Sequence, residues 1–86
     1  MNQETLIEFP ADIAVKAMGL HSDDFEACIT ELVMPHILPQ SASVTTRPSK
    51  GGKYLCVSVR FTAKNLEQLH AVYGALKQEP RVLYTL

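Results

Sequence analysis

Apolar and polar residues alternate along residues 54–63, a pattern that places every second side chain on the same face of a β-strand. The expected core face carries Leu55, Val57, Val59 and Phe61, and the expected outer face carries Tyr54, Cys56, Ser58, Arg60 and Thr62. Residues 12–18 repeat the pattern, with Ile13, Val15 and Ala17 inward and Ala14, Lys16 and Met18 outward. The chain therefore contains two predicted strands that each bury one face.

Two other segments place apolar residues at helical spacing. The first follows Ser22–Asp24, a stretch that supplies a capping residue and acids suited to a helix N-terminus, and is expected to end at about Met34, just before Pro35. Its apolar stripe consists of Phe25, Cys28, Ile29, Leu32 and Val33. The second is predicted to begin at Asn65, with Gln68 as a capping-box partner, and to end before Pro80. Its apolar stripe consists of Leu66, Leu69, Val72, Tyr73 and Leu76.

The remaining segments complete a β-α-β-β-α-β order. Residues 41–48 are β-prone, and Gly51-Gly52 is expected to close a hairpin with the strand over 54–63 through positive φ. Residues 81–86 are also β-prone. This order predicts one α+β domain over residues 1–86 with the ferredoxin-like fold, an antiparallel sheet in the order 4-1-3-2 with both helices on one face. The other face of the sheet is expected to stay open unless a partner covers it.

Length and charge narrow the function classes. A domain of 86 residues buries a modest share of its surface, so a homodimer stays an open alternative. The net charge of −1 gives no overall attraction to nucleic acid or to an anionic membrane, which predicts that any binding is local. No segment resembles a secretion signal or a membrane span, and the protein is expected to be cytoplasmic.

The outward faces of the two central strands form a candidate surface for a ligand or partner. It consists of Lys16, Met18, Tyr54, Cys56, Ser58 and Arg60, joined by Arg47 or Thr45 from the neighbouring edge strand. Two cations near a tyrosine can hold an anion, although charged sheet faces are more often simply solvated. Because Lys16 and Arg60 would repel each other, a small anionic ligand or an acidic partner surface would stabilise this arrangement.

Glycine-containing turns give a second candidate. The candidate loop residues are Gly19, Ser49, Lys50, Gly51, Gly52 and Lys53. The turn over 48–53 exposes backbone N–H groups beside two lysines, as a phosphate site would. It lacks the spacing of a phosphate-binding P-loop and precedes a strand, so a plain hairpin tip is the favoured reading.

Cysteine and histidine positions do not indicate a metal site or a cofactor. Neither cysteine lies in a paired ligand spacing, and two free thiols are expected. Cys28 falls on a helical apolar stripe, where cysteine usually acts as a small buried hydrophobe. Cys56 faces outward and is the better candidate for a reactive thiol, but no base is evident beside it.

Two functions known for this topology fit poorly. Acylphosphatases need a cationic cradle after the first strand, where residues 19–24 instead carry Asp23 and Asp24. RNA-recognition motifs read bases with two or three aromatic side chains on the central strands, where only Tyr54 qualifies. No catalytic residue is predicted.

Several short motifs, in order, resemble the YbeD-like family of small uncharacterised bacterial proteins. The carriers are Phe9-Pro10, Lys16–Gly19, Pro48–Tyr54, Val57–Val59, Glu67-Gln68, Tyr73 and Val82–Leu86. The resemblance implies a ferredoxin-like fold similar to ACT regulatory domains, and the family offers no agreed catalytic residues. It also implies that Gly19 could fill the place of the ACT glycine at the junction of first strand and first helix, in a pocket often formed between subunits.

These observations together favour a noncatalytic regulatory or interaction module. It is expected to bind a partner protein or a small anionic ligand through the open sheet face or a sheet edge. The alternatives are a small enzyme of acyl-phosphate or thiol chemistry and, less favoured, a nucleic-acid-binding module.

Overall fold

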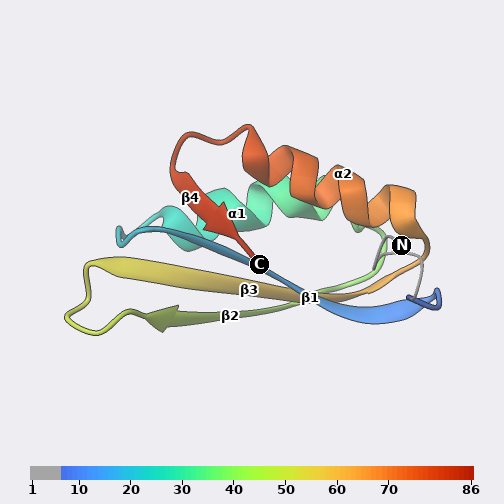
Figure 1. The fold of residues 1–86 in the computed structure, drawn as a ribbon, viewed down its shortest axis with the longest axis horizontal. Coiled ribbons are helices and arrows are strands. Elements are labelled where there is room, and N and C mark those ends of the chain that lie inside the picture. Colours follow the sequence, from blue (N-terminus) through green and yellow to red (C-terminus); the bar gives the residue numbers. More distant parts are fainter. Residues whose placement is uncertain (1–6) are drawn as a thin grey trace.

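A computed structural model describes residues 7–86 and contains four strands and two α-helices (Figure 1). The elements in chain order are β1 (Ala11–Leu20), α1 (Phe25–Val33), the 3-10 turn η2 (Met34–His36), β2 (Ser43–Pro48), β3 (Tyr54–Ala63), α2 (Leu66–Lys77) and β4 (Val82–Thr85). The strands form one antiparallel sheet in the order β2-β3-β1-β4, which confirms the predicted topology. Both helices lie on one face of the sheet and leave the opposite face uncovered (Figure 1).

The two central strands alternate as predicted. Val15 and Ala17 of β1 are buried against the helices, as are Leu55, Val57, Val59 and Phe61 of β3. Lys16 and Arg60 are exposed, whereas Cys56 and Ser58 are partly exposed on the open face. Strand β1 extends to Leu20, two residues beyond its predicted end, because its pairing with β3 continues as far as Tyr54.

The second predicted helix cap is present and the first is not. The Asn65 side chain accepts a hydrogen bond from the Gln68 amide, and the Gln68 side chain accepts one from the amide of Lys64, one residue before the cap. At the start of α1 the N-cap residue Asp24 makes no side-chain cap, because its carboxylate instead accepts hydrogen bonds from Ser22 and Arg81.

The hairpin between β2 and β3 closes as expected. Gly51 and Gly52 both have positive φ, at 86° and 78°. Ser49 fastens the turn, since its backbone accepts from the Gly52 amide and donates to the Tyr54 carbonyl, both at 2.8 Å. Just before β2, the Gln40 side chain donates a hydrogen bond to the Thr62 carbonyl and accepts one from the Thr62 amide, as the backbone of a further strand residue would.

One hydrophobic core joins the sheet to the helices. Its fully buried large side chains include Phe25, Ile29, Val33 and Ile37 from the segment around α1, and Val72 and Leu76 from α2. Cys28, expected to be buried on α1, is partly exposed. Within residues 7–86, no helix is long and apolar enough to cross a membrane.

Candidate functional site

Strand register defines a row of side chains across the middle of the open face. Arg47 of β2 lies opposite Cys56 of β3, Cys56 lies opposite Met18 of β1, and Met18 lies opposite Tyr84 of β4. The next row contains Thr45, Ser58, Lys16 and Leu86, where Leu86 joins Lys16 through two backbone hydrogen bonds of 2.9 and 3.1 Å. The predicted residues Lys16, Met18, Cys56 and Ser58 are therefore neighbours.

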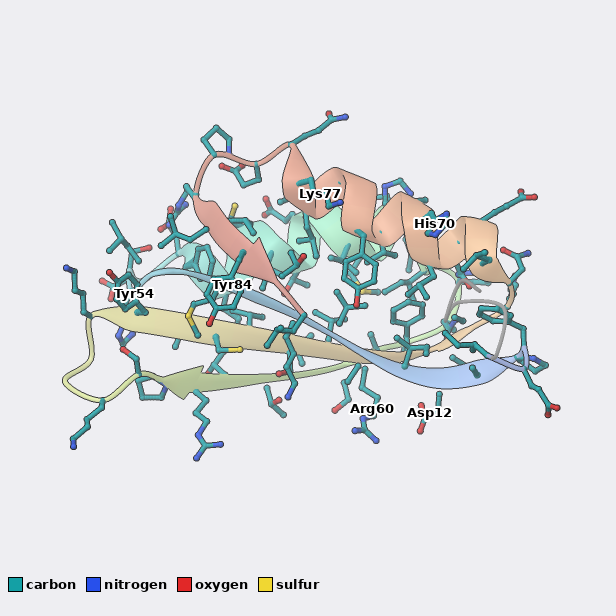
Figure 2. The ribbon with its side chains drawn as sticks, in the orientation of Figure 1. Asp12, Tyr54, Arg60, His70, Lys77 and Tyr84 are labelled. Atoms are coloured by element: carbon teal, nitrogen blue, oxygen red, sulfur yellow. The ribbon has the colours of Figure 1, made fainter. Side chains whose placement is uncertain are left out.

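Tyr54 and Arg60, however, lie far apart on this face (Figure 2). Tyr54 is opposite Leu20 at one end of β3, and Arg60 is opposite Ala14 near the other. They are six positions apart along β3, which is roughly 20 Å at the rise of an extended chain. The cation beside Tyr54 is Lys53, whose ammonium lies 5.4 Å from the ring centroid. One small anion cannot contact both Tyr54 and Arg60.

An acidic side chain offsets the expected repulsion between Lys16 and Arg60. Asp12 of β1 points the same way as Arg60, away from the helices (Figure 2), and its carboxylate lies 3.7 Å from the guanidinium. Both side chains are about two-thirds exposed, so the pair contributes at most about 1 kcal/mol to stability. The repulsion that suggested an anionic ligand is thus largely relieved within the chain.

Five of the candidate loop residues, Ser49–Lys53, form the tip of the hairpin between β2 and β3. The Gly52 amide is used within the turn, and its carbonyl lies 3.1 Å from Nδ1 of His21. The His21 amide donates to the Lys53 carbonyl at 2.9 Å, which ties the tip to the segment after β1. Lys50 and Lys53 are exposed. The structure therefore supports the hairpin-tip reading of this turn.

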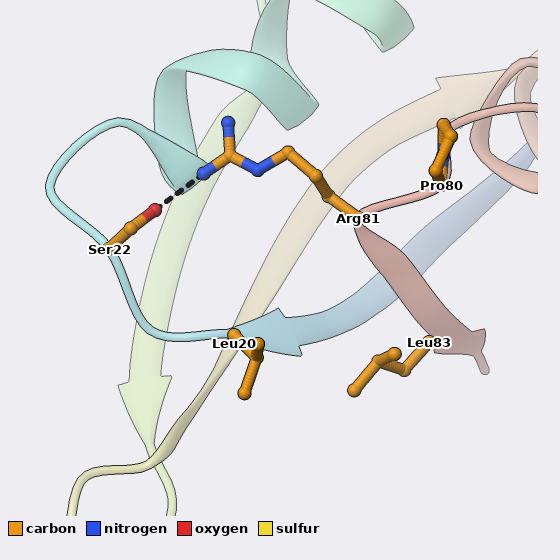
Figure 3. Close-up of a pocket in the computed structure, with 5 residues that line it drawn as sticks. All are labelled: Leu20, Ser22, Pro80, Arg81 and Leu83. Carbon is orange, nitrogen blue, oxygen red and sulfur yellow. Dashed lines mark hydrogen bonds between the residues drawn. The ribbon is translucent and has the colours of Figure 1, made fainter.

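A shallow pocket of about 380 Å³ lies where the end of β1 meets the start of β4 (Figure 3). Its lining residues are Leu20, Ser22, Pro80, Arg81 and Leu83. Gly19 precedes the lining residue Leu20 and is buried, and a Cβ there would be 2.4 Å from the Arg81 carbonyl and 2.6 Å from the Phe25 ring. This glycine allows β4 to approach β1 closely, beside the irregular register between Met18 and Gly19.

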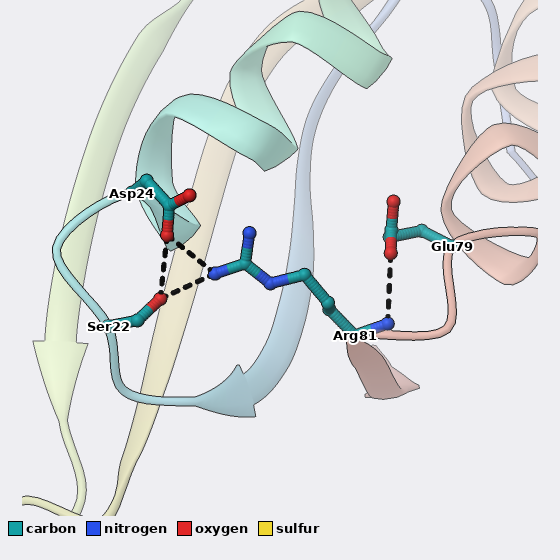
Figure 4. A network of polar contacts seen from close by, with 4 residues as sticks. All are labelled: Ser22, Asp24, Glu79 and Arg81. Carbon is teal, nitrogen blue, oxygen red and sulfur yellow. Dashed lines mark hydrogen bonds and ion pairs between the residues drawn. The ribbon is translucent and has the colours of Figure 1, made fainter.

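Arg81 organises the polar side of this pocket (Figure 4). Its Nη2 donates to Ser22 Oγ and to Asp24 Oδ1, the latter at 2.8 Å, and its guanidinium carbon lies 5.5 Å from the Phe25 ring centroid. Its backbone amide donates to the Glu79 carboxylate at 3.0 Å. The hydrogen bond from Arg81 lowers the pKa of Asp24. The guanidinium is therefore already neutralised by an acid of the same chain.

Arg81→Gln should return the pKa of Asp24 toward its usual range. A lowered carboxyl pKa in the folded state stabilises the fold above the unfolded pKa, and this contribution is lost as the pH falls through the folded pKa. The variant should therefore lose less stability than the wild type as the pH falls from the unfolded-state pKa of Asp24 to its folded-state pKa. Titration of the Asp24 carboxyl by NMR measures the shift, with Lys77→Gln as the control that leaves it in place. An unchanged Asp24 titration in Arg81→Gln would contradict the assigned contact.

Thiol and metal chemistry receive little support from the geometry. Burial raises the pKa of the Cys28 thiol, and the nearby Glu79 raises it further, which disfavours the thiolate. Cys56 lies between Arg47 and Met18 on the open face. Among residues 7–86, histidine, cysteine and acidic side chains do not gather in a group of three that could hold a metal ion.

Charge is segregated between the two sides of the molecule. The open face and its hairpin tip carry Lys16, Arg47, Lys50, Lys53 and Arg60 against the acid Asp12. The helices and their flanking turns carry six acids against three cations, Lys64, Lys77 and Arg81. The acids are Asp23, Asp24, Glu26, Glu31, Glu67 and Glu79. A chain with a net charge of −1 thus presents a positive face.

The sequence reading missed several residues of the open face and the pocket. Leu20 follows from extending the alternation of β1 by two residues, but Tyr84 is recognisable only from the register of β4 with β1. Arg81 reaches residues nearly sixty positions earlier in the chain, and no local pattern signals that contact. Asp12 continues the outward parity of β1 and could have been included.

Comparisons with known proteins agree with this fold and with the motifs. Residues 4–86 match the family described as "Protein of unknown function (DUF493)". A UPF0250 protein of Bordetella pertussis is 41% identical over 87 residues, which cover 98% of this chain and 93% of that protein. A UPF0250 protein of Neisseria gonorrhoeae is 37% identical over 86 residues, covering 99% and 94%.

A solved structure supports the architecture independently. The solution structure of protein HP0495 from H. pylori superposes with a TM-score of 0.75 over 93% of this chain and 85% of that one, at 17% identity. At that identity the likeness concerns the fold alone. The motifs, the full-length matches and the ferredoxin-like topology agree, and the chain belongs to the DUF493 family of small bacterial proteins, the family of the YbeD-like proteins it resembles.

Proposed function

We propose that this protein is a noncatalytic interaction module whose open sheet face binds an acidic surface of a partner protein. One observation carries the proposal: the face that the helices leave uncovered combines exposed apolar side chains with an excess of cations. Leu20, Tyr84 and Leu86 are 57%, 51% and 66% exposed, and the partly exposed Met18 and Cys56 lie between Tyr84 and β2. Specific protein interfaces have this anatomy, with an apolar centre and a polar rim.

The shape of the surface favours a macromolecular partner. Its cations are spread over the sheet, since Lys16 lies on β1, Arg47 on the edge strand β2 and Lys53 at the hairpin tip. This spread favours an extended partner over one small anion. A flat acidic protein surface can meet all of them, and complementary charge would speed association and fix orientation. The same positive charges disfavour two copies packing face to face.

A regulatory role through a small ligand would depend on the pocket at Arg81. Three of its lining side chains are apolar, and the guanidinium already bonds to Asp24. Asp24 would also repel an acyl phosphate placed there. These contacts favour the interaction surface over ligand sensing or acyl-phosphate chemistry.

Nucleic-acid binding is the second candidate, because Tyr54 and Tyr84 share the open face with the cations. Stacked bases need aromatic platforms along the path of the strand, and salt-sensitive affinity would follow from phosphate contacts. Asp12 and the exposed leucines of the same face argue for a protein surface instead.

Charge reversal on the open face should abolish partner binding. In Lys16→Glu/Arg47→Glu both changes lie at exposed positions of the open face, Arg47 in the row of Cys56 and Lys16 in the next row, so the fold should be retained. The control Lys64→Glu/Lys77→Glu changes net charge equally at the two ends of α2. Proteins retained from a native bacterial lysate by the wild type and the control, but lost by the open-face variant, are purified and titrated by calorimetry.

The proposal requires at least one such protein, with an affinity that falls as salt rises and falls at least tenfold in the open-face variant. Equal affinity of the two variants for every purified partner would overturn it. Retention of RNA or DNA in place of protein, lost in the same variant, would replace it with the nucleic-acid reading.

A further inference from the structure

Strand β2 is an edge strand whose outer side is free among the described residues. It pairs with β3 on one side, and no strand within residues 7–86 lies on the other. All of its residues except Val44 are exposed. Arg47 and Pro48 protect one end of the edge, while residues 43–46 carry no charge and no proline. Natural proteins usually protect such an edge more fully.

The other edge of the sheet is less available. Strand β4 has four residues, and its register with β1 is irregular between Met18 and Gly19. The Tyr73 hydroxyl donates to the Leu86 carbonyl just beyond its end, which anchors this strand to α2. A short, bulged strand is a poor template for pairing.

The hydrogen-bond pattern identifies which groups of β2 point outward. The Ser49 amide donates to the Tyr54 carbonyl, and in an antiparallel pair every second residue bonds its partner strand. The residues of β2 that bond β3 are therefore Arg47, Thr45 and Ser43. The amide and carbonyl groups of Val44 and Thr46 consequently face away from β3. They offer two donors and two acceptors in one line.

We infer that β2 pairs with β2 of a second copy of this chain, antiparallel across a two-fold axis at Thr45. This register aligns each Val44 with Thr46 of the other copy and satisfies the outward donors and acceptors of both. It also joins the two sheets into one of eight strands. The proposal concerns an edge and is independent of the function proposed for the open face.

Side-chain chemistry in this register fits a second copy. Arg47 lies opposite Ser43 of the other copy, and Thr45 lies opposite its own equivalent, so no like charges meet. Val44 and Thr46 form β-branched cross-strand pairs on the helix side. A contact of five paired β2 residues, Ser43–Arg47, on each copy is a small interface, so the dimer should dissociate on dilution.

The mass in solution tests this inference through light scattering over a range of protein concentrations. The wild type should approach twice the monomer mass at high concentration. Thr45→Lys, which places two cations at the axis, should stay monomeric, whereas Thr62→Lys on the same face of β3 should behave as the wild type. Thr46→Pro removes an outward amide that β3 does not use, and should also be monomeric with unchanged circular dichroism.

A cysteine at the axis tests the register. In a Cys28→Ser/Cys56→Ser background, Thr45→Cys should form a disulfide-linked dimer under mild oxidation, because directly opposed residues of a pair without hydrogen bonds lie about 4.5 Å apart at Cα. Ser43→Cys on the same edge should not, since its equivalent lies roughly 13 Å further along the strand. A wild type that stays monomeric, a dimer that survives Thr45→Lys, or equal cross-linking at both positions would overturn the inference.

Discussion

Phe61→Ala is expected to lower the free energy of unfolding by about 3–5 kcal/mol, because it removes an aromatic ring from the buried face of β3 and leaves a cavity. The Phe61 side chain is 3% exposed and lies opposite Ile13 in the register of the central strands. A domain of this length has a total stability of only about 4–13 kcal/mol. The variant should therefore be close to unfolding at physiological temperature.

Urea denaturation followed by circular dichroism measures the loss. The matched control is Ser58→Ala, three residues earlier on the same strand and on the opposite, open face. It removes only a partly exposed hydroxyl, and a change within about 0.5 kcal/mol is expected. A loss in Ser58→Ala as large as that in Phe61→Ala would mean that the two faces of β3 are not divided between core and surface as described.

The buried face of each central strand was predictable because the alternation of apolar and polar residues within the strand decides which face packs in the core. On β3, a shift of one residue would place Arg60 and Ser58 in the core and Val57 in water, at a cost no other contact could offset. The helix cap at Asn65 was predictable for the same reason, because its side chain bonds the amide of Gln68 only three residues later. Such features depend only on neighbours in the sequence.

The pocket, and the distances between side chains on the open face, depend on contacts between distant parts of the chain. The local pattern of residues does not predict these contacts. The stretch Ser22–Asp24 predicts a side-chain cap for α1, but the guanidinium of Arg81, just before β4, binds the carboxylate of the N-cap residue Asp24 instead. Tyr54 and Arg60 share a face by parity, yet their distance along β3 separates them into different surfaces. Parity predicts the side on which a residue lies, whereas only register and strand ends show which residues meet.

Gly19 illustrates how a residue predicted as part of a ligand site acts through packing. Resemblance to ACT domains placed it at the junction of the first strand and first helix, as a pocket glycine. In the structure it lies in β1, where an added Cβ would meet the Arg81 carbonyl and the Phe25 ring, and the pocket is lined by its neighbour Leu20 and by Arg81. Its effect on any pocket function is therefore exerted through the position of Arg81.

Gly19→Ala should accordingly destabilise the fold by about 1–3 kcal/mol, the usual cost of forcing extra atoms into a packed site. The new Cβ would lie 2.4 Å from the backbone carbonyl of Arg81, so either β4 or Phe25 must move. Gly74→Ala is the matched control, because its Cβ meets nothing within 4 Å and alanine favours the interior of α2 by up to about 1 kcal/mol. The same chemical change should thus lower the melting temperature at one glycine and raise it at the other. If the displaced element is β4, the contact of Arg81 with Asp24 is lost as well, and the pKa of Asp24 rises toward its usual range in Gly19→Ala alone. Equal melting temperatures for the two variants would show that β4 does not pack against Gly19 as closely as this structure places it.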